Sequence, residues 1–363
     1  MRALVLSHVY HDRENRRKLR ELASLGWSMT VAVPGGSSES DGQLRVAPVP
    51  ATGPADDPEG RRWSRRALRK LFSDVRPDLV QIEEEPGTSA ALAAAREARR
   101  LEIPVVLFSW DSVPRDRGWR ERRRHVATLG CAAAVIGGNS LAQGLLSSPA
   151  SGLPSLSLPQ FGTAPPPARE RSSGPELAIG FVGRLVPERG ADRLLRACGQ
   201  LMGSWSLTIA GTGPEQEALE LLAERLGLAA RTRWPGAQTR AQIAELWQRT
   251  DCLVVPSRST PAWVERWSPV LVEAMAHGVA PVVSAEGALP EMVGEAGVVF
   301  RDEEELLLRL QELVADPARR SALGAAARRR VLDRYQDAAL ARSLDRFWKE
   351  VLARRPEAAG AAT

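Results

Sequence analysis

The 363-residue chain has few cysteines, few lysines and no long apolar run. Cys131, Cys198 and Cys252 are widely separated, and each lies in an apolar segment. This spacing favours reduced core residues over a disulfide framework or a metal site. No apolar stretch approaches the ~20 residues that a membrane-spanning helix needs. The opening residues, MRALVLSHVY, predict a first β-strand and not a signal peptide, so we expect a cytoplasmic protein.

Charge is abundant but unevenly placed. Residues 1–165 hold 23 of the 49 Lys+Arg and 18 of the 44 Asp+Glu, so the whole net charge of +5 lies there. All but three of the cations in the chain are arginine. Residues 61–70 and 115–124 each carry six cations and one tryptophan. Such clusters suit an anionic membrane surface, but neither segment has the broad apolar face of an interfacial helix, so we favour a solvated arginine-rich face.

Short apolar runs alternate with helical segments along the chain. This alternation predicts an α/β fold with parallel sheets and helices on both faces. In the first half we expect strands at 3–7, 29–33, 79–82, 104–109 and 132–136, and a helix over 15–25. The polar residues 37–60 predict a loop with at most one short strand, at 44–49. In the second half the expected strands include 177–182, 206–210, 252–255, 280–284 and 298–300.

A shift in composition divides the chain. Residues 163–174 are rich in proline, serine and charge, which indicates a linker between two domains. We therefore predict an N-terminal Rossmann-like domain over 1–165, a linker over 166–174 and a second Rossmann-like domain over 175–335. The apolar stripe Leu340, Leu344, Phe347 and Val351 predicts an amphipathic helix over 336–353, and residues 354–363 are expected to be disordered.

Residues 256–278, PSRSTPAWVERWSPVLVEAMAHG, follow a buried strand and carry clear helix signals. Ser268 suits the N-cap, Pro269 the first helical position and Gly278 the C-terminal stop. Glu265 precedes this helix and Glu273 lies one turn inside it, so both carboxylates can face one ligand above a phosphate-favouring helix start. Two merely solvated glutamates are the alternative that their spacing alone leaves open.

Residues 179–190, IGFVGRLVPERG, place two arginines in a turn between a strand and a helix. Gly183 ends the strand, and Arg184 and Arg189 follow in the turn. Cations beside a helix N-terminus favour a diphosphate ligand. A solvated basic turn is the alternative.

Both stretches resemble the retaining glycosyltransferases of family four, which have the GT-B fold. The E-x7-E motif of that family matches Glu265 and Glu273, followed by Ala274, Met275, Ala276, Gly278, Pro281, Val282 and Val283. Trp267 and Ser268 replace the usual phenylalanine and glycine, and Arg189 replaces a lysine. The resemblance covers most of residues 177–299. It implies two doubly wound Rossmann-like domains that face a cleft, with a C-terminal helix that crosses back to the first domain.

The resemblance also implies transfer of a sugar, with retention, from a nucleotide-diphosphate donor to an acceptor hydroxyl, with a UDP- or GDP-sugar as the expected donor. Arg184 and Arg189 would stabilise the leaving diphosphate, while Glu265 would contact the donor sugar and Glu273 the ribose. These two arginines and Glu265 form the expected catalytic set. The other expected donor-binding residues are Gly183, Gln238, Trp267, Ser268, Pro269, Val270 and Leu271. Because the sequence has no Asp-x-Asp, we expect no metal, and no cofactor is implied.

In the first half the resemblance is weaker, and the candidates come from strand ends, where site residues of parallel sheets gather. The acceptor-side candidates are His8, Tyr10, His11 and Arg13, after the first strand, and Asp111, after a later one. A plain polar loop is an equal alternative. The run Glu83, Glu84 and Glu85 also follows a strand. We expect it to be solvated, with an acceptor contact as the alternative.

Several functions remain open at this point. The expected acceptor is a sugar, a lipid-linked molecule or a small molecule, and no nucleic acid is expected. Peripheral contact with the inner face of the membrane is a further hypothesis. The alternatives are a sugar-nucleotide epimerase or hydrolase on the same fold, or a non-catalytic nucleotide-sugar-binding subunit. The intact Glu265, Glu273 and Arg184 count against the last of these.

Overall fold

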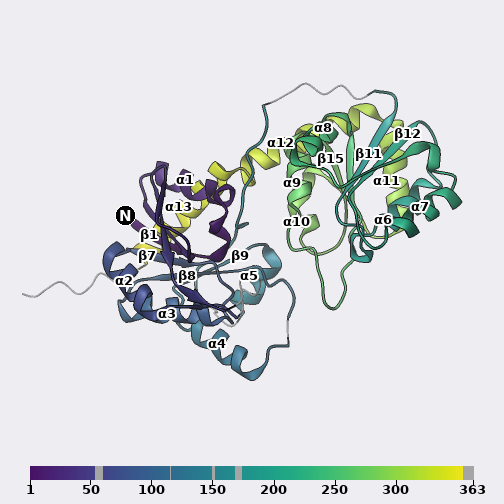
Figure 1. Cartoon of the computed structure of the whole chain (residues 1–363). Helices are drawn as coiled ribbons and strands as arrows, with labels where there is room; N and C mark the ends of the chain where they lie inside the picture. Colours follow the sequence, from purple (N-terminus) through teal and green to yellow (C-terminus); the bar gives the residue numbers. More distant parts are fainter. Residues whose placement is uncertain (54–59, 115, 149–151, 168–173, 355–363) are drawn as a thin grey trace, which may run out of the picture. The chain divides into compact units, whose positions relative to one another are not determined.

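The computed structural model describes residues 1–53, 60–114, 116–148, 152–167 and 174–354, and the chain divides into two compact units (Figure 1). Unit 1 combines Met1–Gly162 with Asp337–Thr363, and unit 2 is Thr163–Gln336. Residues 168–173 of the expected linker and 355–363 of the expected tail lie outside the described residues. No helix in the described part of the chain is long and apolar enough to span a bilayer.

Unit 1 is built on an eight-stranded sheet with the order β10-β9-β8-β7-β1-β2-β4-β3, in which only β3 runs antiparallel. The strands are β1 (Arg2–Leu6), β2 (Ser28–Pro34), β3 (Glu39–Asp41), β4 (Leu44–Val49), β7 (Leu79–Ile82), β8 (Val105–Ser109), β9 (Ala134–Gly137) and β10 (Ser155–Ser157). A separate hairpin pairs β5 (Ala51–Thr52) with β6 (Arg62–Trp63). Since β1 lies between β2 and β7, the chain winds outward in both directions from β1.

Helices cover both faces of this sheet. On one face lie α2 (Arg65–Val75), α3 (Ser89–Arg100), α4 (Trp119–Leu129) and α5 (Ser140–Ser147), all of which contribute to a single apolar cluster. On the other face lie α1 (Arg17–Ser24) and the C-terminal helix α13 (Asp337–Ala353). The stripe Leu340, Leu344, Phe347 and Val351 is buried there, as its periodicity predicts.

Two tryptophans tie α13 to unit 1. Trp348 stacks edge-on against Trp27 with ring centroids 5.0 Å apart, and its Nε1 donates a hydrogen bond to Gln81 Oε1 on β7 at 2.8 Å. Trp27 in turn donates from Nε1 to Asp345 Oδ1 at 2.8 Å. The last helix of the chain is therefore part of the first unit.

Unit 2 has a six-stranded, fully parallel sheet with the order β13-β12-β11-β14-β15-β16. Its strands are β11 (Leu177–Val182), β12 (Trp205–Ala210), β13 (Thr232–Gly236), β14 (Cys252–Val255), β15 (Ala280–Ser284) and β16 (Val298–Phe300). One face is covered by α6 (Ala191–Cys198), α7 (Gln216–Arg225) and α11 (Glu303–Ala315). The other is covered by α8 (Arg240–Arg249), α9 (Pro269–Ala276), α10 (Leu289–Val293) and α12 (Pro317–Arg334) (Figure 1). The predicted α/β class with two doubly wound units is confirmed.

The differences from expectation lie in polar segments. The helix expected over 15–25 is shorter, because two 3-10 helices, His8–His11 and Arg13–Arg16, precede α1. The described part of the polar stretch 37–60 holds three short strands and not one, because β3 and β5 accompany the expected β4. Strands as short and polar as β3 and β5 give no apolar alternation, so their sequence pattern does not differ from that of a loop.

Candidate functional site

The two motif loops of unit 2 meet where the winding of its sheet reverses. Strands β11 and β14 pair side by side, but the chain after β11 turns toward β12 while the chain after β14 turns toward β15. Parallel sheets leave a crevice at the carboxyl ends of two such strands, and ligands bind there. The loop 183–190 follows β11 and the loop 256–268 follows β14, so both belong to this crevice.

A glycine allows these loops to touch. Gly190 has a φ of +69°, and a Cβ at this position would lie well inside 3.0 Å of the Pro256 carbonyl oxygen. The adjacent backbone is fixed as well, because Arg258 N donates to Glu188 O at 2.8 Å. A residue with a side chain at position 190 would therefore push the two loops apart.

An ion pair joins the two motifs. The Arg189 guanidinium donates to Glu265 Oε2, and Ser257 Oγ donates to the same oxygen at 3.0 Å. Arg189 also lies over the Trp263 ring, 5.3 Å from its centroid. Only 3% of the Glu265 side chain is exposed. Burial raises the pKa of Glu265, and Arg189 and Ser257 offset part of that rise.

Arg184 differs from Arg189 in the contacts of its side chain. The Arg184 side chain is exposed, and this side chain makes no hydrogen bond or ion pair with any residue that the structure describes. The backbone that follows Arg184 is fixed by a hydrogen bond, which Leu185 N donates to Thr212 O at 3.0 Å. Beside it, Gly183 lies so close to Gly211 that a Cβ on Gly211 would overlap the Gly183 carbonyl oxygen. A cation with no side-chain partner among the described residues thus lies on a well-anchored turn at the crevice.

Glu273 has different neighbours from Glu265. Its carboxyl group is half-buried on α9, and burial raises its pKa, while a hydrogen bond with Trp247 of α8 and the charge of Arg240 lower it. The two glutamates therefore have separate surroundings. Ser268 occupies the N-cap of α9 as expected, but its side chain makes no capping hydrogen bond.

The remaining donor-side candidates differ in exposure. Trp267 is half-buried and packs edge-on against Tyr335, with centroids 5.4 Å apart. Pro269 is exposed and Val270 is partly exposed, whereas the Leu271 side chain is fully buried in the core. The predicted donor contact of Leu271 is therefore left to its backbone. Gln238 is partly exposed, donates to Pro235 O at 2.8 Å and borders a cavity of about 520 Å³ between α8 and the strands β11, β12 and β13.

Unit 1 has its own reversal point, between β1 and β7, and His8 lies there. His8 N donates to Glu84 Oε1 at 2.8 Å, and the His8 Nδ1 lies 2.9 Å from Glu84 Oε2. The Glu84 side chain is 2% exposed, against 29% for that of His8. A carboxylate that holds both the backbone and the ring fixes the direction in which the imidazole points.

The acidic run after β7 is not solvated, so that expectation is wrong. Glu83 and Glu84 are buried. Glu83 accepts a hydrogen bond from Tyr10 OH at 2.6 Å and from Gln160 Nε2 at 2.9 Å, with Lys18 Nζ at 3.5 Å. Tyr10 is fully buried, and burial followed by the Glu83 charge raises its pKa. Tyr10 is therefore a core residue and not an acceptor contact.

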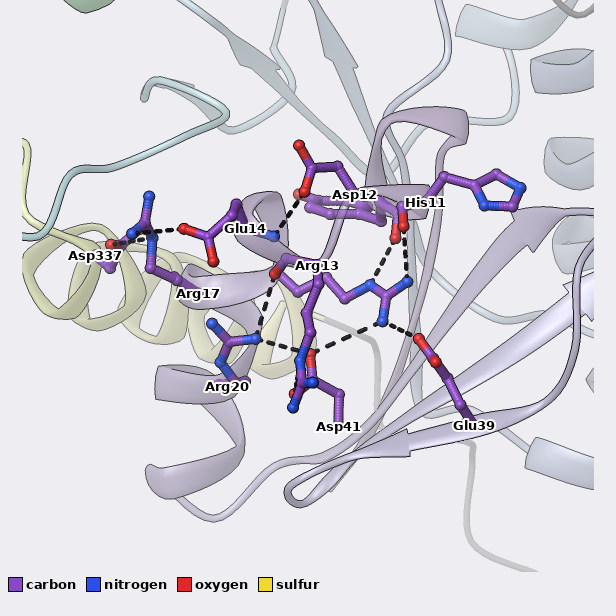
Figure 2. Close-up of polar contacts among 11 residues, drawn as sticks. His11, Asp12, Arg13, Glu14, Arg17, Arg20, Glu39, Asp41 and Asp337 are labelled. Atoms are coloured by element: carbon purple, nitrogen blue, oxygen red, sulfur yellow. Dashed lines mark hydrogen bonds and ion pairs between the residues drawn. The ribbon is translucent and has the colours of Figure 1, made fainter. Parts of the chain in front are cut away.

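The other acceptor-side candidates are engaged within unit 1. Figure 2 shows Asp41 of β3 as the shared partner of Arg13 and Arg20, at 3.2 and 2.7 Å. His11 Nε2 lies 2.7 Å from Pro34 O. Asp111 is buried, and its Oδ2 accepts a hydrogen bond from Arg117 Nη2 at 2.6 Å. The contacts of Arg13 and His11 stabilise the loop after β1, and that of Asp111 stabilises the loop after β8. Among the acceptor-side candidates, His8 has a buried carboxylate behind its ring.

Sequence reasoning missed three of these partners: Ser257, Trp263 and Glu84. Ser257 and Trp263 lie inside the loop that the motif defines, but neither has a distinctive spacing. Glu84 was noted only as one of a run of glutamates. No sequence signal separates it from Glu85, because only the pairing of β1 with β7 brings it to His8.

Two family models of glycosyltransferases match separate parts of the chain. Residues 167–330 match the family model described as "Glycosyl transferases group 1", and residues 13–140 match the one described as "Glycosyl transferase 4-like domain". The chain is also similar to the UDP-bound structure of Anabaena Alr3699/HepE, with a TM-score of 0.69 and 18% identity over 96% of this chain and all of that one. At that identity the likeness shows the fold alone.

Two curated relatives are similar over part of the chain. One is the GDP-mannose-dependent alpha-(1-6)-phosphatidylinositol monomannoside mannosyltransferase of Mycolicibacterium smegmatis, 33% identical over 46% of this chain and 47% of that protein. The other is the D-inositol 3-phosphate glycosyltransferase of Segniliparus rotundus, 35% identical over 42% of this chain and 35% of that protein. The matched regions span less than half the length of either relative.

Proposed function

Because this chain combines a group 1 glycosyltransferase domain with a glycosyltransferase 4-like domain on the GT-B fold, we propose that it transfers a sugar from a nucleotide-diphosphate donor to an acceptor hydroxyl. The observation that carries this proposal is the crevice of unit 2. There the Arg184 side chain has no partner among the described residues, and Arg189, on the same loop, pairs with the buried Glu265. This arrangement offers positive charge for a diphosphate and a carboxylate for sugar hydroxyls.

The two arginines have distinct roles in the proposed reaction. The bond between the anomeric carbon and the diphosphate oxygen breaks, and its electron pair passes to the diphosphate. Arg184 stabilises that charge directly, because no partner within the described part of the chain competes for its side chain. Arg189 adds positive charge to the site while it remains paired with Glu265. The same pair fixes the Glu265 carboxylate in position to accept hydrogen bonds from the donor sugar. Positioned cations of this kind lower the barrier without reorganising as the charge develops.

The acceptor oxygen bonds to the anomeric carbon, and its proton passes to the departing diphosphate. We propose retention of configuration, which the family resemblance supports. The proposal also assigns charge neutralisation to the arginines and not to a metal, since the sequence lacks an Asp-x-Asp pair. Glu273, one turn into α9, is assigned to the nucleotide ribose, and Gln238 to the base side. His8 is the proposed acceptor contact in unit 1.

Names of relatives suggest the first substrates to try. The two curated relatives are named for GDP-mannose, phosphatidylinositol monomannoside and D-inositol 3-phosphate, and the similar solved structure holds UDP. We therefore propose UDP- and GDP-sugars as donors, with inositol phosphates, sugars and lipid-linked glycosides as acceptors. Peripheral contact with a membrane is part of this proposal, because α4 exposes Trp119 and Val126, each to 64%, beside several arginines.

The test is a donor-consumption assay with and without acceptor. The proposal predicts that nucleoside diphosphate and a glycosylated product appear together, only when a suitable acceptor is present. Arg184→Ala should nearly abolish both. Conversion of the donor without any acceptor would favour an epimerase or hydrolase instead. Tight nucleotide binding without turnover across the acceptor panel would favour a non-catalytic subunit.

A further inference from the structure

A second cavity, of about 300 Å³, lies in unit 1 along α3, far in sequence from both motif loops. Helices α2 and α3 form its walls, and α4 contributes one residue. Ten residues line it, among them Arg65, Arg69, Arg96, Glu97, Arg100 and Arg124. Half of these ten residues are arginine, and one is an acid.

The charges in this cavity do not balance. Glu97 is buried and pairs with Arg100 at 2.6 Å and with Arg69 at 3.6 Å. Arg65 and Arg96 are exposed and have no side-chain partner among the residues that the structure describes. With Arg124, whose Nε donates to Gly87 O at 2.6 Å, the cavity holds five guanidinium groups against one carboxylate.

The chain brings these arginines together from three segments. Arg65 and Arg69 come from the basic cluster 61–70 and Arg124 from the cluster 115–124, while Arg96 and Arg100 lie on the alanine-rich helix α3. Arginines on a convex surface point away from one another and are separately hydrated. Here they line one concave site, where their fields add and attract an anion. The planar guanidinium fork matches the oxygens of a phosphate group.

We propose that this cavity binds a phosphate-bearing ligand with at least two negative charges. The site goes beyond the proposed function, because it shares no residue with the donor crevice of unit 2. A volume of about 300 Å³ is at the small end for ligand sites, which suits a diphosphate or a phosphorylated headgroup more than a whole nucleotide sugar. The phosphate can belong to a soluble metabolite or to a lipid, and the two sources are separable by experiment.

The experiment measures pyrophosphate binding to the full-length protein by calorimetry. In Arg65→Gln/Arg96→Gln the affinity should fall about tenfold or more, since two charge-assisted contacts are lost. The matched control is Arg62→Gln/Arg66→Gln, which removes the same charge from exposed residues outside the cavity and should change the affinity less than about twofold. Glu97→Gln removes the carboxylate that competes for the arginines, so it should raise the affinity.

Two further arms separate the outcomes. Pyrophosphate can also bind the donor crevice, so the titration is repeated in Arg184→Ala. Binding that survives this change but is lost in Arg65→Gln/Arg96→Gln belongs to the cavity, whether or not the donor proposal holds. Flotation with phosphatidic acid vesicles then identifies the source. Vesicle binding that pyrophosphate displaces indicates a lipid phosphate, and pyrophosphate binding without vesicle binding indicates a soluble ligand.

Clear results would overturn the proposal. Equal losses in the cavity variant and its control would show that only net charge matters. Absence of binding to both pyrophosphate and the vesicles would show that the cavity is a solvated groove. A lower affinity in Glu97→Gln, with the melting temperature unchanged, would contradict the assigned role of the arginines.

Discussion

Gly190→Ala tests whether contact between the two motif loops builds the donor site. The backbone at Gly190 has a φ of +69°, which costs an L-residue about 1–2 kcal/mol. The new methyl group would also overlap the Pro256 carbonyl oxygen. Overpacking of this kind adds about 1–3 kcal/mol. We therefore expect the free energy of unfolding to fall by roughly 2–5 kcal/mol.

A matched glycine separates these two effects. Gly227 has a φ of +71°, but nothing lies within 4 Å of the position that its Cβ would take. Gly227→Ala should therefore lose only the conformational part, about 1–2 kcal/mol. Urea denaturation of both variants gives the difference. Nucleoside diphosphate binding should weaken in Gly190→Ala, because the shift separates Arg189 from Glu265, and it should be unchanged in Gly227→Ala. Equal losses of stability and binding in the two variants would refute the reasoning.

Three more results are expected. Glu265→Gln should weaken binding of the sugar nucleotide but not of the bare nucleotide, whereas Glu273→Gln should weaken both; calorimetry that shows equal loss of bare nucleotide would contradict this division. Because the folded pKa of Glu265 is raised, its contribution to stability is present below pH 4.5 and is lost as the pH rises through the folded pKa. Glu265→Gln should thus melt higher than the wild type near neutral pH, and the gain should vanish in acid; a gain that persists below pH 4.5 would be inconsistent with that origin. Co-sedimentation with anionic vesicles should disappear at high salt. It should also disappear when three arginines of α4, Arg120, Arg122 and Arg123, are replaced with glutamine. Absence of sedimentation at low salt would contradict the membrane hypothesis.

The sequence predicted what depends on periodicity and on local signals. The stripe on α13 follows directly from helical spacing, and all four of its apolar residues are buried. The start of α9 at Pro269 follows from the preference of proline for the first helical position. The two motif loops were also recognised, because each joins a buried strand to a helix. Their contact through Gly190 and Pro256 needed the strand order, which periodicity does not contain.

Buried charge was the hardest feature to predict. A run of three glutamates favours solvent on average, yet Glu83 and Glu84 are buried because Tyr10, Gln160 and His8 supply hydrogen bonds from distant segments. The arginine cavity was missed for a similar reason. Its two basic clusters were visible in the sequence, but their convergence on α3 depends on how three helices pack against one sheet face.

The central claim is that the crevice of unit 2 binds the diphosphate of a nucleotide sugar, and Arg184 tests it most directly. Calorimetric titration of UDP and GDP into the wild type, Arg184→Ala and Arg225→Ala is the measurement. A charge-assisted bond contributes about 1.5–3 kcal/mol, so Arg184→Ala should lose about tenfold or more in affinity. Arg225 is an exposed arginine in the last turn of α7, so Arg225→Ala should leave the affinity for UDP and GDP unchanged. An affinity in folded Arg184→Ala equal to that of the wild type would contradict the claim.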